Sequence, residues 1–221
     1  MLVLVAFGVF VLPFAFTTPP PIITRFTSTH IFSPGSPAGR AQARVSIRLS
    51  QPSNVTITVN DASGAVVKTL AGGEVVTTKT LSIPWDGRGE DGKTLPDGAY
   101  TIDLSAQAGE KKFNKSRRVV IDTTAPGAPG LVVRGTGASC IAVVKGPAEA
   151  TRLTVVAMGT GAHADPRDLP AGGTFTWTWN RRAASGAAVT RPVVIQAATT
   201  DLAGNRGIAR RACPAANRSR G

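Results

Sequence analysis

The sequence has few of the residues on which catalysis depends. Its 221 residues include only two histidines, His30 and His163, and neither stands at motif spacing from a serine, a cysteine or a carboxylate. No nucleophile can therefore be paired with a base. Glycine-rich loops of the P-loop or dinucleotide-binding type are also missing. The sequence predicts a protein that is not an enzyme and that binds no cofactor.

Acidic residues are scarce as well. Thirteen Asp and Glu stand against 25 Lys and Arg, which gives a formal net charge of +12. One cluster, formed by Asp86, Glu90, Asp91 and Asp97, gathers several carboxylates, as calcium-binding loops do. Basic residues interrupt this cluster, and Asp with Gly is also the composition of tight turns. We therefore predict turns here and no metal site, with a calcium site as the alternative.

What the sequence does contain is a series of short alternating segments. Residues 45–49 and 55–59 alternate apolar with polar side chains, as do several later segments. Gly, Asn, Asp and Pro separate these segments at a spacing of about ten residues, which is typical of antiparallel strands in a sandwich or barrel. A parallel sheet would need longer connections between its strands. The sequence therefore predicts an all-β fold.

Two turn motifs follow the first group of strands. A tryptophan runs into a glycine-rich turn, and a Pro-Asp-Gly turn then precedes a strand that opens on tyrosine. A tyrosine in such a place can hydrogen-bond back across a corner of a sandwich. The residues of these motifs are Trp85, Asp86, Gly87, Gly92, Pro96, Asp97, Gly98 and Tyr100.

With Phe32-Ser33-Pro34, these motifs make residues 31–124 resemble the FlgD-type immunoglobulin-like domain. That family is known from flagellar hook-capping proteins and from many bacterial surface and secreted proteins. The resemblance implies an Ig-like β-sandwich for this part of the chain.

The C-terminal half repeats the pattern in a weaker form. Trp179 and Gly186 have the same spacing as Trp85 and Gly92, at an offset of 94 residues (179 − 85 = 94). At the same offset, Val189 and Val194 stand where Leu95 and Tyr100 stand in the first half. This offset suits one immunoglobulin-sized domain. We interpret the second half as a divergent second copy, and the alternative is coincidence among glycine-rich β sequences.

The predicted architecture is two tandem immunoglobulin-like antiparallel β-sandwiches after an N-terminal hydrophobic segment. Residues 1–24 are predicted to be an export signal or membrane anchor with a Pro-rich spacer, since residues 1–16 are wholly apolar. For the apolar residues 1–16, the alternative is a buried strand or core helix. Residues 25–124 and 125–213 form the two domains, and residues 214–221 a basic flexible tail. Prolines in residues 122–129 indicate a short, stiff linker between the domains.

The chain has only two cysteines, Cys140 and Cys213, too few for a structural zinc site by themselves. Cys140 lies in an early predicted strand of the second domain, and Cys213 directly follows its last one. A disulfide between them would close a loop of about 70 residues, worth about 4 kcal/mol in the chain-entropy model. With the apolar N-terminus, this predicts a disulfide formed in an oxidising compartment. Two unrelated buried thiols are the alternative.

Two surface features bear on binding. Trp177 and Trp179 are two residues apart and face the same side of a strand, so they are either core residues or an exposed surface for stacking sugars. Residues 125–213 hold ten Lys and Arg against four Asp and Glu, a net charge of +6. Such a surface attracts anionic polymers, and an arginine-rich composition without function is the alternative. The predicted polyanion contacts are Arg181, Arg182, Arg206, Arg210 and Arg211.

The sequence thus favours a non-catalytic protein of the cell surface or extracellular space. Its Ig-like modules would serve as spacer, scaffold or adhesion elements, anchored in the membrane by the N-terminal segment. The expected partners are another protein or an anionic envelope polymer, and no specific nucleic acid. One alternative, implied by the family resemblance, is a flagellar hook-assembly factor. The other is a carbohydrate-binding accessory module.

Overall fold

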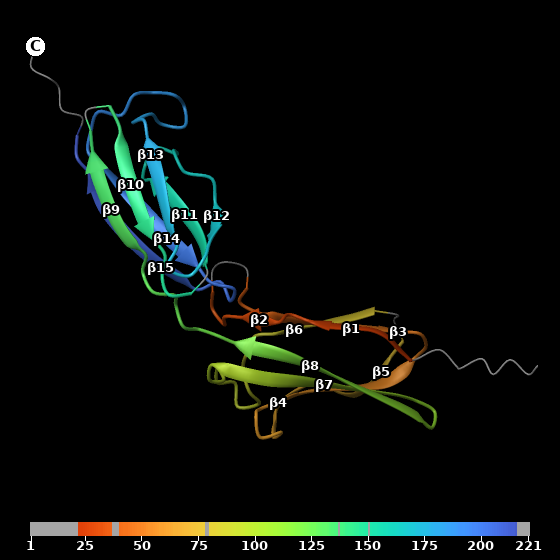
Figure 1. Cartoon of the computed structure of the whole chain (residues 1–221). Helices are drawn as coiled ribbons and strands as arrows, with labels where there is room; N and C mark the ends of the chain where they lie inside the picture. Colours follow the sequence, from red (N-terminus) through yellow and green to blue (C-terminus); the bar gives the residue numbers. More distant parts are fainter. Residues whose placement is uncertain (1–21, 37–39, 78–79, 137, 150, 216–221) are drawn as a thin grey trace, which may run out of the picture.

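The computed structural model describes residues 22–36, 40–77, 80–136, 138–149 and 151–215. Most of the predicted export signal or anchor and most of the predicted basic tail therefore lie outside the described residues. Within the described ranges all regular secondary structure is β-strand, in four sheets. The sheets pair into two sandwiches that lie end to end at an angle, joined by residues 122–129 (Figure 1).

The first sandwich packs a three-stranded sheet on a five-stranded one. The smaller sheet has the order β1-β3-β6, and the larger has the order β2-β8-β7-β4-β5. All pairs are antiparallel except β2 with β8, which is parallel. The strands are β1 (Ile23–Ser28), β2 (Ile31–Phe32), β3 (Ala43–Leu49), β4 (Ser53–Asn60), β5 (Val66–Val76), β6 (Thr80–Trp85), β7 (Gly98–Ala108) and β8 (Lys111–Ile121).

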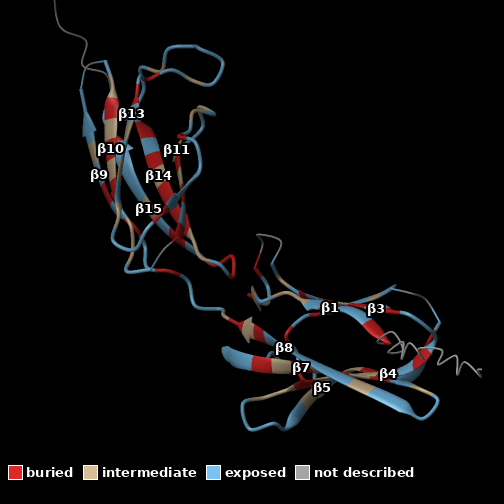
Figure 2. Ribbon diagram, turned by 45° about the vertical axis from the view of Figure 1, so that its right-hand side comes forward, coloured by how far each residue is buried: buried red, intermediate tan, exposed pale blue. Residues whose placement is uncertain are grey.

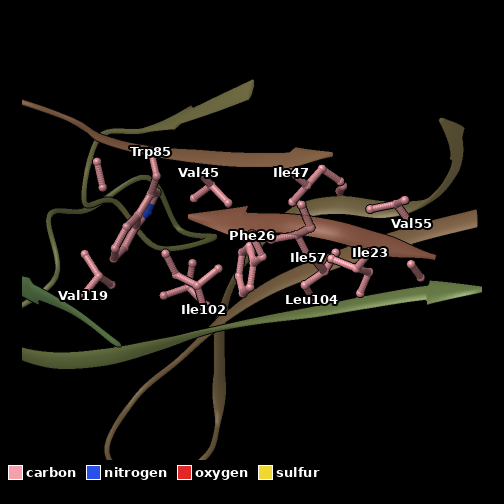
Figure 3. Packing of buried hydrophobic residues seen from close by; sticks show 14 of the residues in the cluster. Ile23, Phe26, Val45, Ile47, Val55, Ile57, Trp85, Ile102, Leu104 and Val119 are labelled. Carbon is pink, nitrogen blue, oxygen red and sulfur yellow. The ribbon is translucent and has the colours of Figure 1, made fainter. Parts of the chain in front are cut away.

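The core of this sandwich follows from the alternation in its strands. Every second residue of β3, for example Val45 and Ile47, is buried, because successive side chains of a strand point to opposite faces. These residues meet Ile57 and Ile102 from the facing sheet (Figure 3). Each such side chain contributes about 1.5–3 kcal/mol when it is fully buried. Trp85 closes one end of the core.

The second sandwich is built in the same manner from seven strands. A sheet of order β13-β10-β9 packs on a sheet of order β12-β11-β14-β15, and all pairs are antiparallel. The strands are β9 (Gly130–Gly135), β10 (Cys140–Lys145), β11 (Thr151–Ala157), β12 (Arg167–Leu169), β13 (Thr174–Trp179), β14 (Val193–Thr200) and β15 (Arg206–Cys213). Buried residues run along the inside of each sandwich separately (Figure 2), so each unit has its own core.

The prediction of an all-β fold with two Ig-like sandwiches is confirmed, but three strands were not predicted. β2 and β12 are too short, at two and three residues, to show any periodicity. β1 begins at Ile23, inside residues 1–24, which were predicted as an export signal or anchor with its spacer. Its alternation is broken by an irregularity between Ile23 and Arg25, which hides the strand in the sequence.

Among the residues that the structure describes, no helix has the length and apolar character needed to cross a membrane.

Candidate functional site

The turn after β6 is held together by its tryptophan. The indole Nε1 of Trp85 donates a hydrogen bond to the carbonyl oxygen of Arg88, at 3.0 Å. The guanidinium of Arg88 donates to the carbonyl oxygen of Gly92, at 2.6 Å. Trp85 itself is buried and packs against Phe32 and Tyr100, with ring centroids 5.4 and 5.9 Å away. The tryptophan therefore fixes the turn and the core with the same side chain.

The turn after β13 repeats these bonds residue for residue. Trp179 Nε1 donates to the carbonyl of Arg182 at 2.7 Å, and Arg182 donates to the carbonyl of Gly186 at 2.8 Å. Each partner lies 94 positions after its counterpart in the first unit (179 − 85, 182 − 88 and 186 − 92). The backbone bond from Leu95 to Gly87 also recurs, from Val189 to Arg181. The two units therefore contain the same structural turn.

The repeat breaks after this turn. Tyr100 is buried at the start of β7, whereas Val194, its counterpart by sequence offset, is exposed. Val193 is the buried residue at the start of β14. The alignment of Val194 with Tyr100 is therefore wrong by one residue, because the second unit is one residue shorter between the turn and the strand.

Arg181 stands where the first unit has Gly87. Both have a positive φ, +79° for Gly87 and +57° for Arg181. A Cβ on Gly87 would lie 2.6 Å from Pro34, so the first unit needs glycine there. Arg181 is only 5% exposed, and its guanidinium donates to the carbonyl of Pro214 at 2.7 Å. Its prediction as a polyanion contact is therefore corrected, because the charged group is enclosed by backbone carbonyls.

The other predicted basic contacts lie on the surface of the second unit. Arg182, Arg206, Arg210 and Arg211 are all exposed. Arg210 Nε donates to Gln196 at 2.8 Å, which uses one of its donors. Arg182 lies in the Trp179 turn, and the other three lie on β15. The exposed arginines of the predicted set thus lie in two separate places, the Trp179 turn and β15.

The acidic cluster serves the turns of the first unit. Asp86 and Asp91 each accept a hydrogen bond from a backbone N–H two residues later, at 3.1 and 3.0 Å. Glu90 accepts from the backbone N–H of Thr69 at 2.6 Å and contacts Lys68 at 3.2 Å. These two contacts lower the pKa of Glu90, the bond from Thr69 most of all. Within the described residues no group of three or more metal-ligating side chains gathers.

Asp97 ties the first unit to the linker. Its carboxylate accepts bonds from the backbone N–H of Thr123 at 3.0 Å, from the Thr123 hydroxyl at 2.7 Å and from the Thr124 hydroxyl at 3.0 Å. Partial burial alone would raise the pKa of Asp97, but these hydrogen bonds outweigh it and lower the pKa. In the same turn, the hydroxyl of Tyr100 donates to the carbonyl of Pro96 at 2.8 Å, which is the corner bond suggested by the sequence. Gly98, at the start of β7, has a φ of +154°.

The second unit holds the linker from the other side. Asn205 Nδ2 donates to the carbonyl of Asp122 at 2.8 Å and to the carboxylate of Asp201 at 3.0 Å. The hydroxyl of buried Thr199 lies between the carbonyl oxygens of Gly127 and Gly207, at 3.4 and 3.3 Å, and can donate its proton to either. Burial, followed by the negative charges of Asp201 and Asp97, raises the pKa of Asp122. The linker is thus bonded to both sandwiches, which its prolines alone did not predict.

A further contact joins the units directly. The hydroxyl of Ser36, in the loop after β2, donates to the carbonyl of Gly204 at 3.1 Å. Gly204 and Asn205 belong to one tight turn, in which Asp201 accepts bonds from both backbone N–H groups. We call the contacts of Ser36, Asp97, Thr199 and Asn205 across the linker the joint. Nothing in the sequence signalled that the Asp201–Asn205 turn meets the other unit.

The two cysteines form a disulfide across the second sandwich. Cys140 begins β10 in one sheet and Cys213 ends β15 in the other, with their Cα atoms 6.2 Å apart. Trp179 lies directly opposite Cys140 in the pairing of β10 with β13. The tryptophan and the disulfide therefore occupy the same end of the second core. Trp177 packs beside Trp179, with ring centroids 6.5 Å apart, and remains partly exposed.

Comparison with known proteins finds a family similarity in the first unit. Residues 35–110 match the family model of the FlgD Ig-like domain. Over these residues the first unit is similar to the FlgD Ig-like domain. Over 55 residues the chain is 46% identical to the basal-body rod modification protein FlgD of Escherichia coli K12, covering 25% of this chain and 23% of that protein. Over 64 residues it is 41% identical to the FlgD of Salmonella typhimurium, covering 28% and 27%. The chain therefore spans about a quarter of the relatives that it matches.

Solved structures align with the chain at low identity and low TM-score. A tetra-tandem repeat from the extending region of a large adhesion protein aligns over 86% of this chain and 50% of its own, with 19% identity and a TM-score of 0.32. A chimeric titin Z1Z2 tandem aligns over 88% and 98%, with 12% identity and a TM-score of 0.32. The FlgD Ig-like domain and its relatives belong to non-enzymatic Ig-like families.

Proposed function

We propose that this chain is a non-catalytic structural protein that takes part in assembly of the flagellar hook. The proposal rests on the FlgD Ig-like domain at residues 35–110. It is supported by the 41–46% identity to proteins named for modification of the basal-body rod. The main reading of the sequence, a surface spacer or adhesion protein, receives less support from these relatives.

The joint supports a scaffolding role for the two units. Because Asp97 accepts hydrogen bonds from the linker and Asn205 donates one to it, the second sandwich has a defined orientation relative to the first. A scaffold that is ordered before binding loses less conformational entropy when its partner docks. The chain would then present the second unit at a fixed place relative to the FlgD-like unit.

The test is deletion of the gene in its host, with hooks counted by electron microscopy and swimming measured in soft agar. We expect missing or malformed hooks, restored by the wild-type chain. Normal hooks in the deletion strain, or a host that makes no flagella, would contradict the proposal. As a control, the Gly72→Ala variant expressed in the deletion strain should restore the hooks, because a Cβ at this position meets nothing within 4 Å.

A second candidate is an envelope-attached spacer outside the cell. It is favoured by the apolar residues 1–16, which suit an export signal or membrane anchor. The exposed residues Arg206, Arg210 and Arg211 would then face anionic envelope polymers. Protease added to intact host cells separates the candidates. The spacer is supported if the protein is found in the membrane fraction, is cleaved by the external protease, and can be deleted without affecting the hooks.

A further inference from the structure

Both units carry a groove at the tryptophan turn, but the two grooves differ in volume and in the residues that line them. The groove of the first unit has a volume of about 330 Å³ and is lined by Lys68, Trp85 and Glu90 among others. That of the second unit has about 490 Å³ and is lined by His163, Trp177 and Arg182 among others. Ligand pockets of proteins span about 300–1,000 Å³, so the second groove has room for a ligand.

In the first unit a side-chain clamp lines the smaller groove. The backbone N–H of Glu90 donates to the carbonyl of Val67 at 3.0 Å. The carboxylate of Glu90 then reaches across to the backbone of Thr69 and to Lys68. In the second unit Ala184 stands at the position of Glu90 (184 − 90 = 94), and its N–H makes the matching bond to Thr160 at 3.0 Å. The backbone bond is retained, whereas the clamp is lost.

The strand before the turn also differs between the units, since Trp177 lines the second groove and its counterpart does not line the first. Ile83 of the first unit corresponds to Trp177 of the second, again at an offset of 94 (177 − 83 = 94). The ring of Trp177 stacks on Trp179, at an interplanar angle of 21°, and remains partly exposed. Unlike Trp85 and Trp179, its Nε1 has no hydrogen-bond partner among the described residues. A partly exposed tryptophan thus lines the second groove, which lacks the carboxylate of the clamp.

The charge of the groove restricts the occupant. The side chains that line it include Arg182, His163 and Asn180, and no Asp or Glu. Nδ1 of His163 lies 3.1 Å from the carbonyl of Gly161, and its Nε2 has no partner within the described part of the chain. A flat aromatic ring stacks well on the apolar face of a sugar ring, and a nearby guanidinium binds a carboxylate. Residues 125–213 also carry a net charge of +6, from ten basic and four acidic residues.

We propose that the groove at Trp177 binds an acidic sugar of a polysaccharide chain. The sugar ring would stack on Trp177, and its carboxylate would meet Arg182. This inference rests on the second unit alone and does not depend on a role in hook assembly.

The test measures binding of oligogalacturonate, a polymer of hexuronic acid, by the full chain in a fluorescence or calorimetric titration. Trp177→Ile gives the second unit the residue of the first, and Ala184→Glu adds the carboxylate of the first. We expect each change to weaken binding at least tenfold. Ala212→Glu, exposed on β15 at the far edge of its sheet, adds the same charge and should change binding less than threefold.

Three comparisons can overturn the proposal. Equal binding of polyglutamate would show that charge alone is sensed, and equal binding of neutral dextran would remove the role of the carboxylate. A proline-rich peptide is the third comparison. If Trp177→Ile no longer binds this peptide but still binds oligogalacturonate normally, the groove is a peptide site. Absence of oligogalacturonate binding by the wild-type chain would also contradict the proposal. If Trp177→Ile fails to fold, Ala184→Glu decides the matter alone.

Discussion

Gly207 of β15 lies directly against the backbone of the linker. A Cβ added to Gly207 would lie 2.6 Å from the carbonyl oxygens of both Pro126 and Gly127. Ordinary contact needs about 3.5 Å, so in Gly207→Ala the linker backbone must move by about 1 Å. Both obstructing atoms belong to the backbone, and no side chain can rotate away to relieve the contact. The substitution therefore directly disturbs the packing of the linker at the joint.

The expected cost follows from this contact. Overpacking a well-packed site costs about 1–3 kcal/mol. Alanine in a strand gains about 0.5–1 kcal/mol over glycine, which offsets part of the loss. We therefore expect Gly207→Ala to lower the free energy of unfolding of the second sandwich by about 1–2 kcal/mol, or to release the linker and change the angle between the units.

Two measurements cover both outcomes. Urea unfolding followed by tryptophan fluorescence gives the stability, and small-angle X-ray scattering gives the overall dimensions of the chain. Gly72→Ala is the matched control, because its Cβ meets nothing within 4 Å and its φ is not positive. If Gly207→Ala matches this control in both the urea midpoint and the scattering curve, the packing of the linker against β15 is wrong.

Three more predictions concern single contacts. Replacing both Cys140 and Cys213 by Ser should lower the free energy of unfolding by about 4 kcal/mol, and an unchanged urea midpoint under oxidising conditions would exclude the bond. Tyr100→Phe keeps the ring beside Trp85 but loses the bond to Pro96, so we expect a loss of about 1 kcal/mol in urea unfolding, and no loss would make the corner bond unimportant. Because the pKa of Asp97 is lowered in the folded chain, its stabilisation is present above its unfolded pKa of about 3.9 and is lost as the pH falls through the lower, folded value. Asp97→Asn should therefore make the stability of the chain fall less steeply below about pH 4 than in the wild type, and identical slopes in acid titrations followed by circular dichroism would contradict this.

Local patterns were enough to predict the sandwiches. In β3 and β4 the alternation of apolar and polar residues coincides with the alternation of buried and exposed ones, since one face of each strand meets the core. The Trp85 turn could be predicted because its glycines and its tryptophan act within a few residues of one another. Short strands such as β12 carry no such pattern, because their place depends on pairing with a partner strand.

The joint could not be predicted in the same way. Asn205 and Asp122 are 83 residues apart in the sequence, and the donor and acceptor meet only when two complete domains have folded. Arg181 is a second case in which the sequence alone did not predict the position of a side chain. Its charge predicted a place on the surface, but the turn that it shares with the first unit directs it beneath the carbonyls of Thr136 and Pro214. Tertiary contacts decide both cases.

The most direct test of the account is the relative orientation of the two sandwiches in solution. Backbone residual dipolar couplings, measured on the weakly aligned chain, report the alignment of each unit separately. Because the joint bonds the linker to both sides, we predict that one alignment tensor fits the couplings of both units in the orientation of Figure 1. Tensors of different magnitude for the two units would mean that they move independently, and the proposed rigid scaffold would then be contradicted.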